Sequence, residues 1–208
     1  MISADNLKIG FIVWNPFMVY HMKSIAEKLK NSHFLVLDYQ KNIKVLNLFG
    51  DNPNEFFNAE YHVIKPKDFK ELDGIYDAVI CPNPFPGIEF LNRTKCIGMQ
   101  YSMAKDRYVN GAWRAMFDMT MTYGKYSAER INHFCSVSMV GNPRFEKWFS
   151  ENTAHQIEDY SIPLDVNKAT LLYLPTWGEF SSVDRFLDSI KELSDEYNVL
   201  IKMHHKTD

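Results

Sequence analysis

Cysteines are scarce in this chain, and the three that occur do not form pairs. Cys81, Cys96 and Cys135 are far apart, and each lies within an apolar run that predicts a strand. An odd and scattered set argues against a disulfide framework, and no CxxC pair or Cys/His cluster has the spacing of a zinc site. We therefore expect buried thiols in a reducing compartment and no metal ligands.

A large excess of charge of either sign is also missing, since 23 basic and 26 acidic residues give a formal net charge of -3. The chain as a whole lacks the positive charge that a nucleic-acid backbone attracts. No apolar run approaches the roughly 20 residues that span a bilayer, and the N-terminus does not read as a secretory signal. We expect a cytoplasmic protein that binds no nucleic acid and reaches a membrane only by peripheral association.

Three catalytic motifs are absent as well. The chain has no GxGxxG, which binds dinucleotides, and no GxxxxGK[ST], the phosphate-binding loop of P-loop NTPases. It also has no GxSxG, the nucleophile turn of many esterases. These absences argue against a dinucleotide cofactor, P-loop chemistry and a serine esterase.

What the chain does have is a regular alternation of short apolar runs with helix signals. The runs contain β-branched or aromatic residues and end in polar or turn residues, as strands do. They cover residues 8–14, 34–37, 61–64, 77–81, 94–99, 118–123 and 135–140. Asn15-Pro16 and Gly141-Asn142-Pro143 predict helix starts after the first and last runs, with Asn as the cap. The pattern predicts an α/β fold with a parallel, Rossmann-like sheet.

The alternation lapses between about residues 150 and 167, where weakly periodic polar sequence indicates a domain boundary. We assign residues 1–150 to an N-terminal Rossmann-like domain, residues 151–167 to a linker, and residues 168–208 to the start of a second domain that we expect to be truncated.

The second domain starts with a predicted βαβ unit. Strands at 169–174 and 199–201 flank a helix whose apolar residues run from Phe180 to Leu193, with Ser181 and Asp184 as a capping box. Two strands and one helix enclose too little core to be stable alone. Either this unit packs onto the first sheet or the natural chain continues, and we favour the second alternative.

Ligands of open α/β sheets bind beyond the carboxyl ends of the strands, so the residues that follow each strand are the candidates. Gly141, Asn142 and Arg144 combine a glycine, a helix start and a guanidinium, which suits a phosphate; the alternative is a tight turn with a solvated arginine. Lys202 and His204 project to one face at the end of the last strand, where a histidine suits acid catalysis or phosphate binding; the alternative is a frayed terminus.

A further set follows the fifth predicted strand. Gln100, Tyr101 and Lys105 suit an acceptor hydroxyl or a phosphate, and Asp106 suits a general base. A plain surface loop is the alternative for all four. His21 falls within the first predicted helix, where we interpret it as a packed or surface residue rather than a catalyst.

Three segments also match sequence elements in the order and spacing of one family. Residues 141–146 (GNPRFE) resemble G-x-P-R-x-D, residues 172–177 (LYLPTW) resemble L-Y-x-P-T-W, and residues 197–204 (YNVLIKMH) resemble Y-x-v-i-i-K-x-H-P. The chain thus resembles the CDP-glycerol glycerophosphotransferases, the teichoic-acid and capsule polymerases. The resemblance implies a GT-B fold of two Rossmann-like domains. It implies an acceptor on the first domain, a CDP- or UDP-type donor on the second and no cofactor.

The resemblance also carries roles to matching positions. The donor and phosphate set is Gly141, Asn142, Arg144, Thr176, Trp177 and Lys202, and His204 is a catalytic candidate. The family usually has W-H-G-x-x-x-K after the fifth strand, with the His as expected base. Here Lys105 matches the Lys, but Gln100 replaces the His and cannot take a proton at neutral pH. The base is then Asp106 or a residue outside this chain, or the chemistry differs; of these we predict Asp106. We predict Asn15, Gln100, Tyr101 and Lys105 as acceptor-binding residues.

The sequence thus leads to the hypothesis of a transferase that moves a glycerophospho or glycosyl group in cell-surface polysaccharide biosynthesis. Its acceptor would be a saccharide or lipid-linked molecule at the inner face of the membrane, and the 208-residue form alone would be inactive. One alternative is a nucleotide-sugar epimerase of the UDP-N-acetylglucosamine 2-epimerase type, which needs no acceptor. The other is a non-catalytic binding module.

Overall fold

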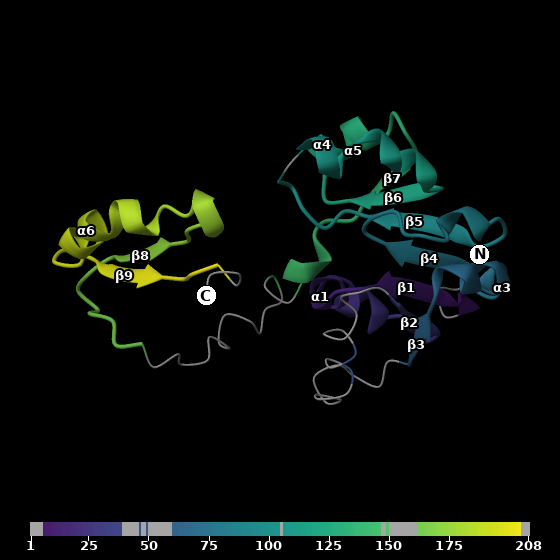
Figure 1. The fold of residues 1–208 in the computed structure, drawn as a ribbon, viewed down its shortest axis with the longest axis horizontal. Helices are drawn as coiled ribbons and strands as arrows, with labels where there is room; N and C mark the ends of the chain where they lie inside the picture. The colour runs from purple at the N-terminus through teal and green to yellow at the C-terminus, as the bar shows by residue number, and fades with distance from the viewer. Residues whose placement is uncertain are drawn as a thin grey trace. The chain divides into compact units, whose positions relative to one another are not determined.

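The chain forms two compact units, Met1–Thr153 and Ala154–Asp208 (Figure 1). The structure, a computed structural model, describes residues 6–38, 46, 49, 60–104, 106–146, 149 and 162–204. Most of the predicted linker, 151–167, lies outside these ranges, so the predicted domain boundaries stay predictions. Within the described ranges, no helix has the length and hydrophobicity that crossing a bilayer requires.

The first unit is built on a seven-stranded parallel sheet, as predicted, with strand order β3-β2-β1-β4-β5-β6-β7. The strands are β1 Ile9–Val13, β2 Ser32–Leu37, β3 Tyr61–Ile64, β4 Ala78–Cys81, β5 Lys95–Met99, β6 Met119–Thr122 and β7 Ser136–Met139. The strand order reverses between β1 and β4, which is the position where open α/β sheets leave a crevice at their carboxyl ends. The predicted α/β, Rossmann-like architecture is confirmed.

Helices and short 3-10 turns connect the strands. They are α1 Pro16–Ala26, η2 Pro66–Asp68, α3 Phe69–Leu72, η3 Ile88–Phe90, α4 Asp106–Val109, η4 Ala112–Met116, α5 Lys125–Ile131 and η5 Pro143–Phe145. Asn15 caps α1 as predicted, because its Oδ1 accepts a hydrogen bond from Met18 N at 3.1 Å. Asn142 caps in the same way, but the element that begins at Pro143 is a 3-10 turn.

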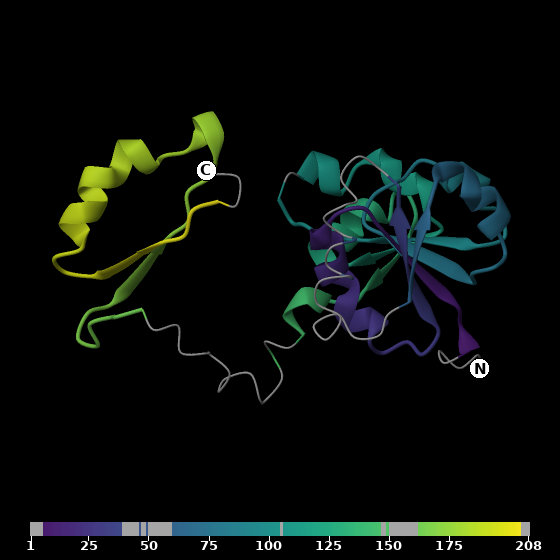
Figure 2. The same cartoon turned by 60° about the horizontal axis from the view of Figure 1, so that its bottom comes forward.

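Both faces of the sheet are covered (Figure 2). Phe11 and Val13 pack under α1 on one face, whereas Ile12 and Leu35 pack against Phe69 of α3 on the other. Burial on two faces explains why the strand signals were continuous apolar runs instead of alternating ones.

The expected buried thiols are found at two of the three cysteine positions. Cys81 and Cys96 are buried, and burial raises the pKa of Cys96 to about 11. Cys135 was also expected to be buried, but it is only half-buried, since it lies just before β7, with its Sγ 3.3 Å from Thr120 Oγ1. All three are free thiols.

The second unit contains the predicted βαβ arrangement. Parallel strands β8 Thr170–Tyr173 and β9 Asn198–Ile201 are joined through η8 Gly178–Phe180 and helix α6 Val183–Leu193. Large apolar side chains stay open to solvent, with Leu172 58% and Phe180 76% exposed. Such exposure is what a single βαβ unit produces, because it encloses little volume.

The predicted start of α6 was wrong. Phe180 belongs to η8, Ser181 is extended, and the helix begins only after Ser182, with no side-chain hydrogen bond at its cap. The capping box of Ser181 with Asp184 therefore does not form. Ser182 has another partner instead, because its Oγ lies 2.6 Å from Tyr173 Oη.

Candidate functional site

Polar side chains from α1, α5, η5 and the residues directly after β5 and β6 meet at the carboxyl ends of these two strands. We call this group the carboxyl-end cluster; its members are His21, Gln100, Tyr123, Ser127 and Arg144. These side chains come together because the strands are parallel, so all of them end on the same side of the sheet and the connections that follow them start there. The cluster joins two predicted site residues, Gln100 and Arg144, to three that were not predicted.

Gln100 is fully buried and holds the cluster together. Its Nε2 donates to Ser102 O at 2.9 Å and to Ser127 Oγ at 2.8 Å, and its Oε1 accepts from Tyr123 N at 2.8 Å. Both amide hydrogens are therefore used inside the protein. The side chain joins the segments after β5 and β6 to α5, and its amide has no hydrogen left for an acceptor molecule.

His21 contacts the same residue through its main chain. Its Nε2 donates to Gln100 O at 2.8 Å, because a carbonyl oxygen can only accept, and Tyr123 Oη lies 3.0 Å from the same nitrogen. Nδ1 is buried and has no hydrogen-bond partner among the described residues. Burial lowers the pKa of His21, Arg144 adds to that effect, and the Gln100 hydrogen bond opposes it.

The lowered pKa of His21 predicts a pH dependence of stability. The native imidazole stays neutral where the unfolded one, with its ordinary pKa of 6.5, takes up a proton. The unfolded state then binds more protons, so stability falls as the pH drops below about 6.5. We expect His21→Gln to weaken this dependence in thermal unfolding between about pH 7 and pH 5. His133→Gln, at an exposed position, is the control, and equal slopes for wild type and His21→Gln would contradict the prediction.

Tyr123 connects the cluster to an open hollow. The hollow has a volume of about 460 Å³ and is lined by Met103, Tyr123, Gly124, Lys125, Tyr126 and Ser127. Burial raises the pKa of Tyr123, so its phenol keeps its proton. Because His21 already donates from Nε2, the Tyr123 O–H is left to donate elsewhere. The phenol is suited to bind an oxygen atom of a ligand.

Arg144 brings positive charge to the same edge of the sheet. Its guanidinium carbon lies 5.4 Å from the centre of the Phe17 ring. Its positive charge adds to the lowering of the His21 pKa by burial, and it opposes the rise that burial causes in the pKa of Tyr123. The side chain is exposed, and no described carboxylate forms an ion pair with it. Gly141, with φ of +75°, and Asn142 shape the turn before it, so these three predicted residues do lie together.

Asp106, the predicted base, lies beside the cluster and not in it. It is exposed, its Oδ1 accepts from Asn110 Nδ2 at 2.6 Å, and Arg130 Nε lies 3.5 Å away. Tyr126 Oη, 3.4 Å from the same oxygen, places Asp106 at the border of the 460 Å³ hollow. Its role as a base stays a prediction.

The predicted acceptor residues are dispersed. Tyr101 packs edge-on against Phe17 with ring centres 6.0 Å apart, next to the cluster. Asn15 uses its Oδ1 to cap α1. Lys105 lies outside the described residues. Acceptor binding by these residues and by Gln100 therefore stays a prediction.

The second unit brings two of its predicted residues together. The rings of Trp177 and His204 stack with centres 5.9 Å apart and an angle of 27° between them. Thr176 and Lys202, which lie close to them in the sequence, are exposed. Lys202 N donates to Tyr173 O at 3.0 Å, which extends the pairing of β9 with β8 by one hydrogen bond. The carboxyl ends of β8 and β9 thus present an aromatic pair, a hydroxyl and an ammonium group.

Sequence reasoning did not single out Tyr123 and Ser127. It interpreted His21 as a packed or surface residue, and the structure shows it packed, but its place in the cluster was not predicted. One signal was available for His21: it lies on the helix face of Met18 and Met22, which are both buried. A polar residue on a buried face needs a partner. Nothing in the sequence identified that partner as the main chain of Gln100.

No protein-family profile matches the sequence, and no curated protein sequence matches it either. Solved structures do match. UDP-N-acetylglucosamine 2-epimerase from Rickettsia bellii has a TM-score of 0.56 at 13% identity, over 96% of this chain and 62% of that one. The S. aureus MnaA–UDP structure has a TM-score of 0.58 at 14% identity with the same coverage. UDP-GlcNAc 2-epimerase from Neisseria meningitidis bound to UDP-GlcNAc reaches 0.61 at 10% identity, over 96% and 66%.

The fold is GT-B-like. The predicted fold class is thereby confirmed, including a Rossmann-like first unit and a βαβ start of a second. The chain spans about three fifths of the length of the first of these structures, which it covers to 62%. Identities this low show the GT-B-like fold alone. None of the three is named as a glycerophosphotransferase.

Proposed function

We propose that this chain belongs to an enzyme that uses a nucleotide-activated sugar or polyol. The observation that carries the proposal is the carboxyl-end cluster of a GT-B-like fold, where Tyr123 and Arg144 offer a phenol and a guanidinium at one edge of the sheet. Arginine binds diphosphate oxygens through two parallel hydrogen bonds, and a tyrosine hydroxyl binds a sugar or phosphate oxygen. In this proposal no cofactor takes part, and the nucleotide-linked donor is a substrate.

Residues of this chain divide the work in the proposed reaction. Arg144 stabilises negative charge on the diphosphate as the bond to the transferred group weakens. Tyr123 orients the ligand with its O–H, and His21 is a positioning residue that fixes Gln100 and Tyr123. Trp177 offers an aromatic surface and Lys202 a charge on the second unit. Asp106 and His204 remain the proposed acid–base residues.

Epimerisation is the first reaction to test. The support for it is that two of the three structures are named as UDP-GlcNAc 2-epimerases, one of them solved with that nucleotide sugar. Incubation of the 208-residue chain, and of any longer natural chain, with UDP-GlcNAc should give an epimerised product without an acceptor, read by NMR of the sugar protons. UDP-GlcNAc that remains unchanged with both chains would rule this activity out.

Transfer of a glycerophospho or glycosyl group is the second candidate. It rests on the elements at residues 141–146, 172–177 and 197–204. The first follows β7, the second runs from the end of β8 into the loop after it, and the third runs along β9. CDP-glycerol or a UDP-sugar should then be consumed only when a saccharide or lipid-linked acceptor is present. Consumption that does not depend on an acceptor would refute this candidate, and binding without any turnover would leave the chain as a binding module.

Arg144 gives the proposal a direct binding test. We expect Arg144→Ala to weaken UDP binding at least about tenfold, because a charge-assisted hydrogen bond is worth about 1.5–3 kcal/mol. Isothermal titration of the chain with UDP measures the change. Lys70→Ala removes the same charge from an exposed position on α3 and should leave the affinity unchanged. Equal affinities for wild type and Arg144→Ala would remove Arg144 from the site.

A further inference from the structure

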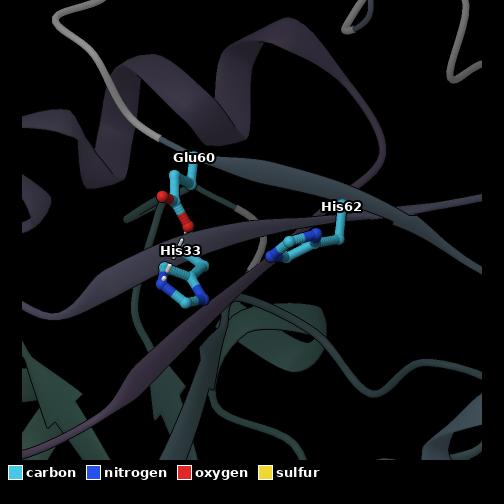
Figure 3. A group of neighbouring side chains, drawn as sticks. All are labelled: His33, Glu60 and His62. Atoms are coloured by element: carbon cyan, nitrogen blue, oxygen red, sulfur yellow. Dashed lines mark ion pairs between the residues drawn. The ribbon is translucent and has the colours of Figure 1, made fainter.

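Two histidines and a glutamate, residue types that can bind metals, meet at the amino ends of β2 and β3, away from the carboxyl-end cluster. His33 lies near the start of β2, Glu60 directly before the edge strand β3, and His62 near the start of β3 (Figure 3). Among the described residues these form the one group of histidine, cysteine or acidic residues with ligand atoms close enough to hold an ion, all within 4.8 Å of one another. We call this group the His–Glu–His cluster.

Parallel pairing of β2 with β3 explains how distant residues come together. Phe34 N donates to Glu60 O at 2.9 Å, and His62 pairs with Leu35. Residues two apart in a strand point to the same face, and so do paired residues of parallel neighbours. His33, Glu60 and His62 therefore share one face by the register of the sheet.

The distances suit a small divalent cation. His33 Nε2 lies 3.5 Å from Glu60 Oε2, and the two histidine rings meet edge to face with centres 5.3 Å apart. Around tetrahedral zinc, bonds of about 2.0–2.1 Å put neighbouring ligand atoms roughly 3.3 Å apart. The Glu60 side chain is 72% exposed, so it has room to turn and bring its carboxylate oxygen from 3.5 Å to the ligand spacing of zinc.

A buried tyrosine orients the first histidine. Tyr76 Oη lies 3.1 Å from His33 Nδ1, and Tyr76 is only 4% exposed. When Nδ1 donates to this oxygen, Nε2 carries the lone pair and faces Glu60. Histidines that bind metals usually donate their second ring N–H to an oxygen in this way, which fixes both ring and tautomer.

We propose that the His–Glu–His cluster binds a divalent transition-metal ion of the zinc type. Two neutral imidazoles and one carboxylate are the nitrogen and oxygen ligands that zinc prefers, and a water would complete a tetrahedron. The ammonium of Lys8, which lies 4.9 Å from the centre of the Tyr76 ring, opposes the cation. The ion would tie the edge strand β3 to β2. It is independent of the proposed nucleotide site.

The test is a titration of the full 208-residue chain with Zn²⁺ after treatment with a chelator. We expect His62→Ala to bind one ion fewer than wild type, or to bind it at least about tenfold more weakly. Glu60→Gln, which keeps the side-chain shape, should act in the same direction. Tyr76→Phe keeps all three ligands and should weaken binding about tenfold through the lost orientation.

The control is His133→Ala, which removes an exposed histidine on the segment after α5. It should bind as wild type does, and Co²⁺ should give the intense visible bands of a tetrahedral site in wild type but not in His62→Ala. Equal binding by wild type and His62→Ala would overturn the proposal, and so would an equal loss in His133→Ala. UDP affinity should be unchanged in His62→Ala, so the outcome is separate from that of the Arg144 test.

Discussion

Gly87→Ala is expected to destabilise the first unit by about 3 kcal/mol or more, the largest effect on stability that we predict. Gly87 has a φ of +101°, where any other L-residue is strained. A β-carbon built there would lie 2.5 Å from Pro66 O and 2.5 Å from Phe69 Cδ2. Phe69 is fully buried, and Pro66 presents main chain, so neither can move away cheaply. Thermal unfolding should show a midpoint lower by roughly 6–12 °C.

Gly141→Ala is the matched control for this prediction. Gly141 also has a positive φ, +75°, but a β-carbon there would meet nothing within 4 Å. Only the conformational cost remains, and we expect a loss of about 1 kcal/mol. Equal losses in the two variants would mean that the close approach of Gly87 to Pro66 and Phe69 contributes nothing.

The second large effect concerns His21. His21→Leu removes the donor to the buried Gln100 carbonyl and the neighbour of Tyr123, and we expect a loss of stability of about 2–3 kcal/mol. In whichever reaction the product assays identify, kcat/KM should fall at least about tenfold, because Tyr123 loses its orientation. Denaturant unfolding and initial rates measure the two effects.

His21→Gln tests whether position or proton transfer matters. The Gln side chain places an N–H near the former Nε2 but cannot take up a proton, so we expect most of the stability and activity to be retained. Full activity in His21→Leu would contradict the positioning role. Loss of activity in His21→Gln without loss of stability would show that the imidazole itself exchanges a proton.

Much of the fold could be predicted because its signals are local. Apolar runs that are buried on both faces, and the Asn15-Pro16 cap, identify strands and a helix from neighbouring residues alone. The start of α6 was predicted wrongly for a related reason. Phe180 and Val183 have helical spacing, but Gly178 with φ of +63° begins a separate 3-10 turn that spacing does not reveal.

The sites were harder to predict because their contacts join distant strands. The Nε2 of His21 donates to the main-chain oxygen of Gln100, and such a contact cannot be predicted from the residue types because every residue has a main-chain oxygen. His33, Glu60 and His62 were not singled out, because only short sequence spacings were considered and these three side chains meet only through the register of β2 and β3; their role as ligands is a proposal. Asp106 was predicted as a base because Gln100 cannot take a proton; in the structure its carboxylate contacts Asn110 and Arg130, and its role as a base stays a prediction.

Gln100 has a consequence for how the protein responds to its surroundings. A carboxamide has the same charge and the same donors and acceptors throughout the physiological pH range. Its three bonds to Ser102, Ser127 and Tyr123 therefore persist while groups around them gain or lose protons. A histidine at position 100 would lose or gain hydrogen bonds to the segments after β5 and β6 and to α5 whenever its protonation changed. With glutamine, these three hydrogen bonds do not depend on a proton taken up or lost by residue 100 itself.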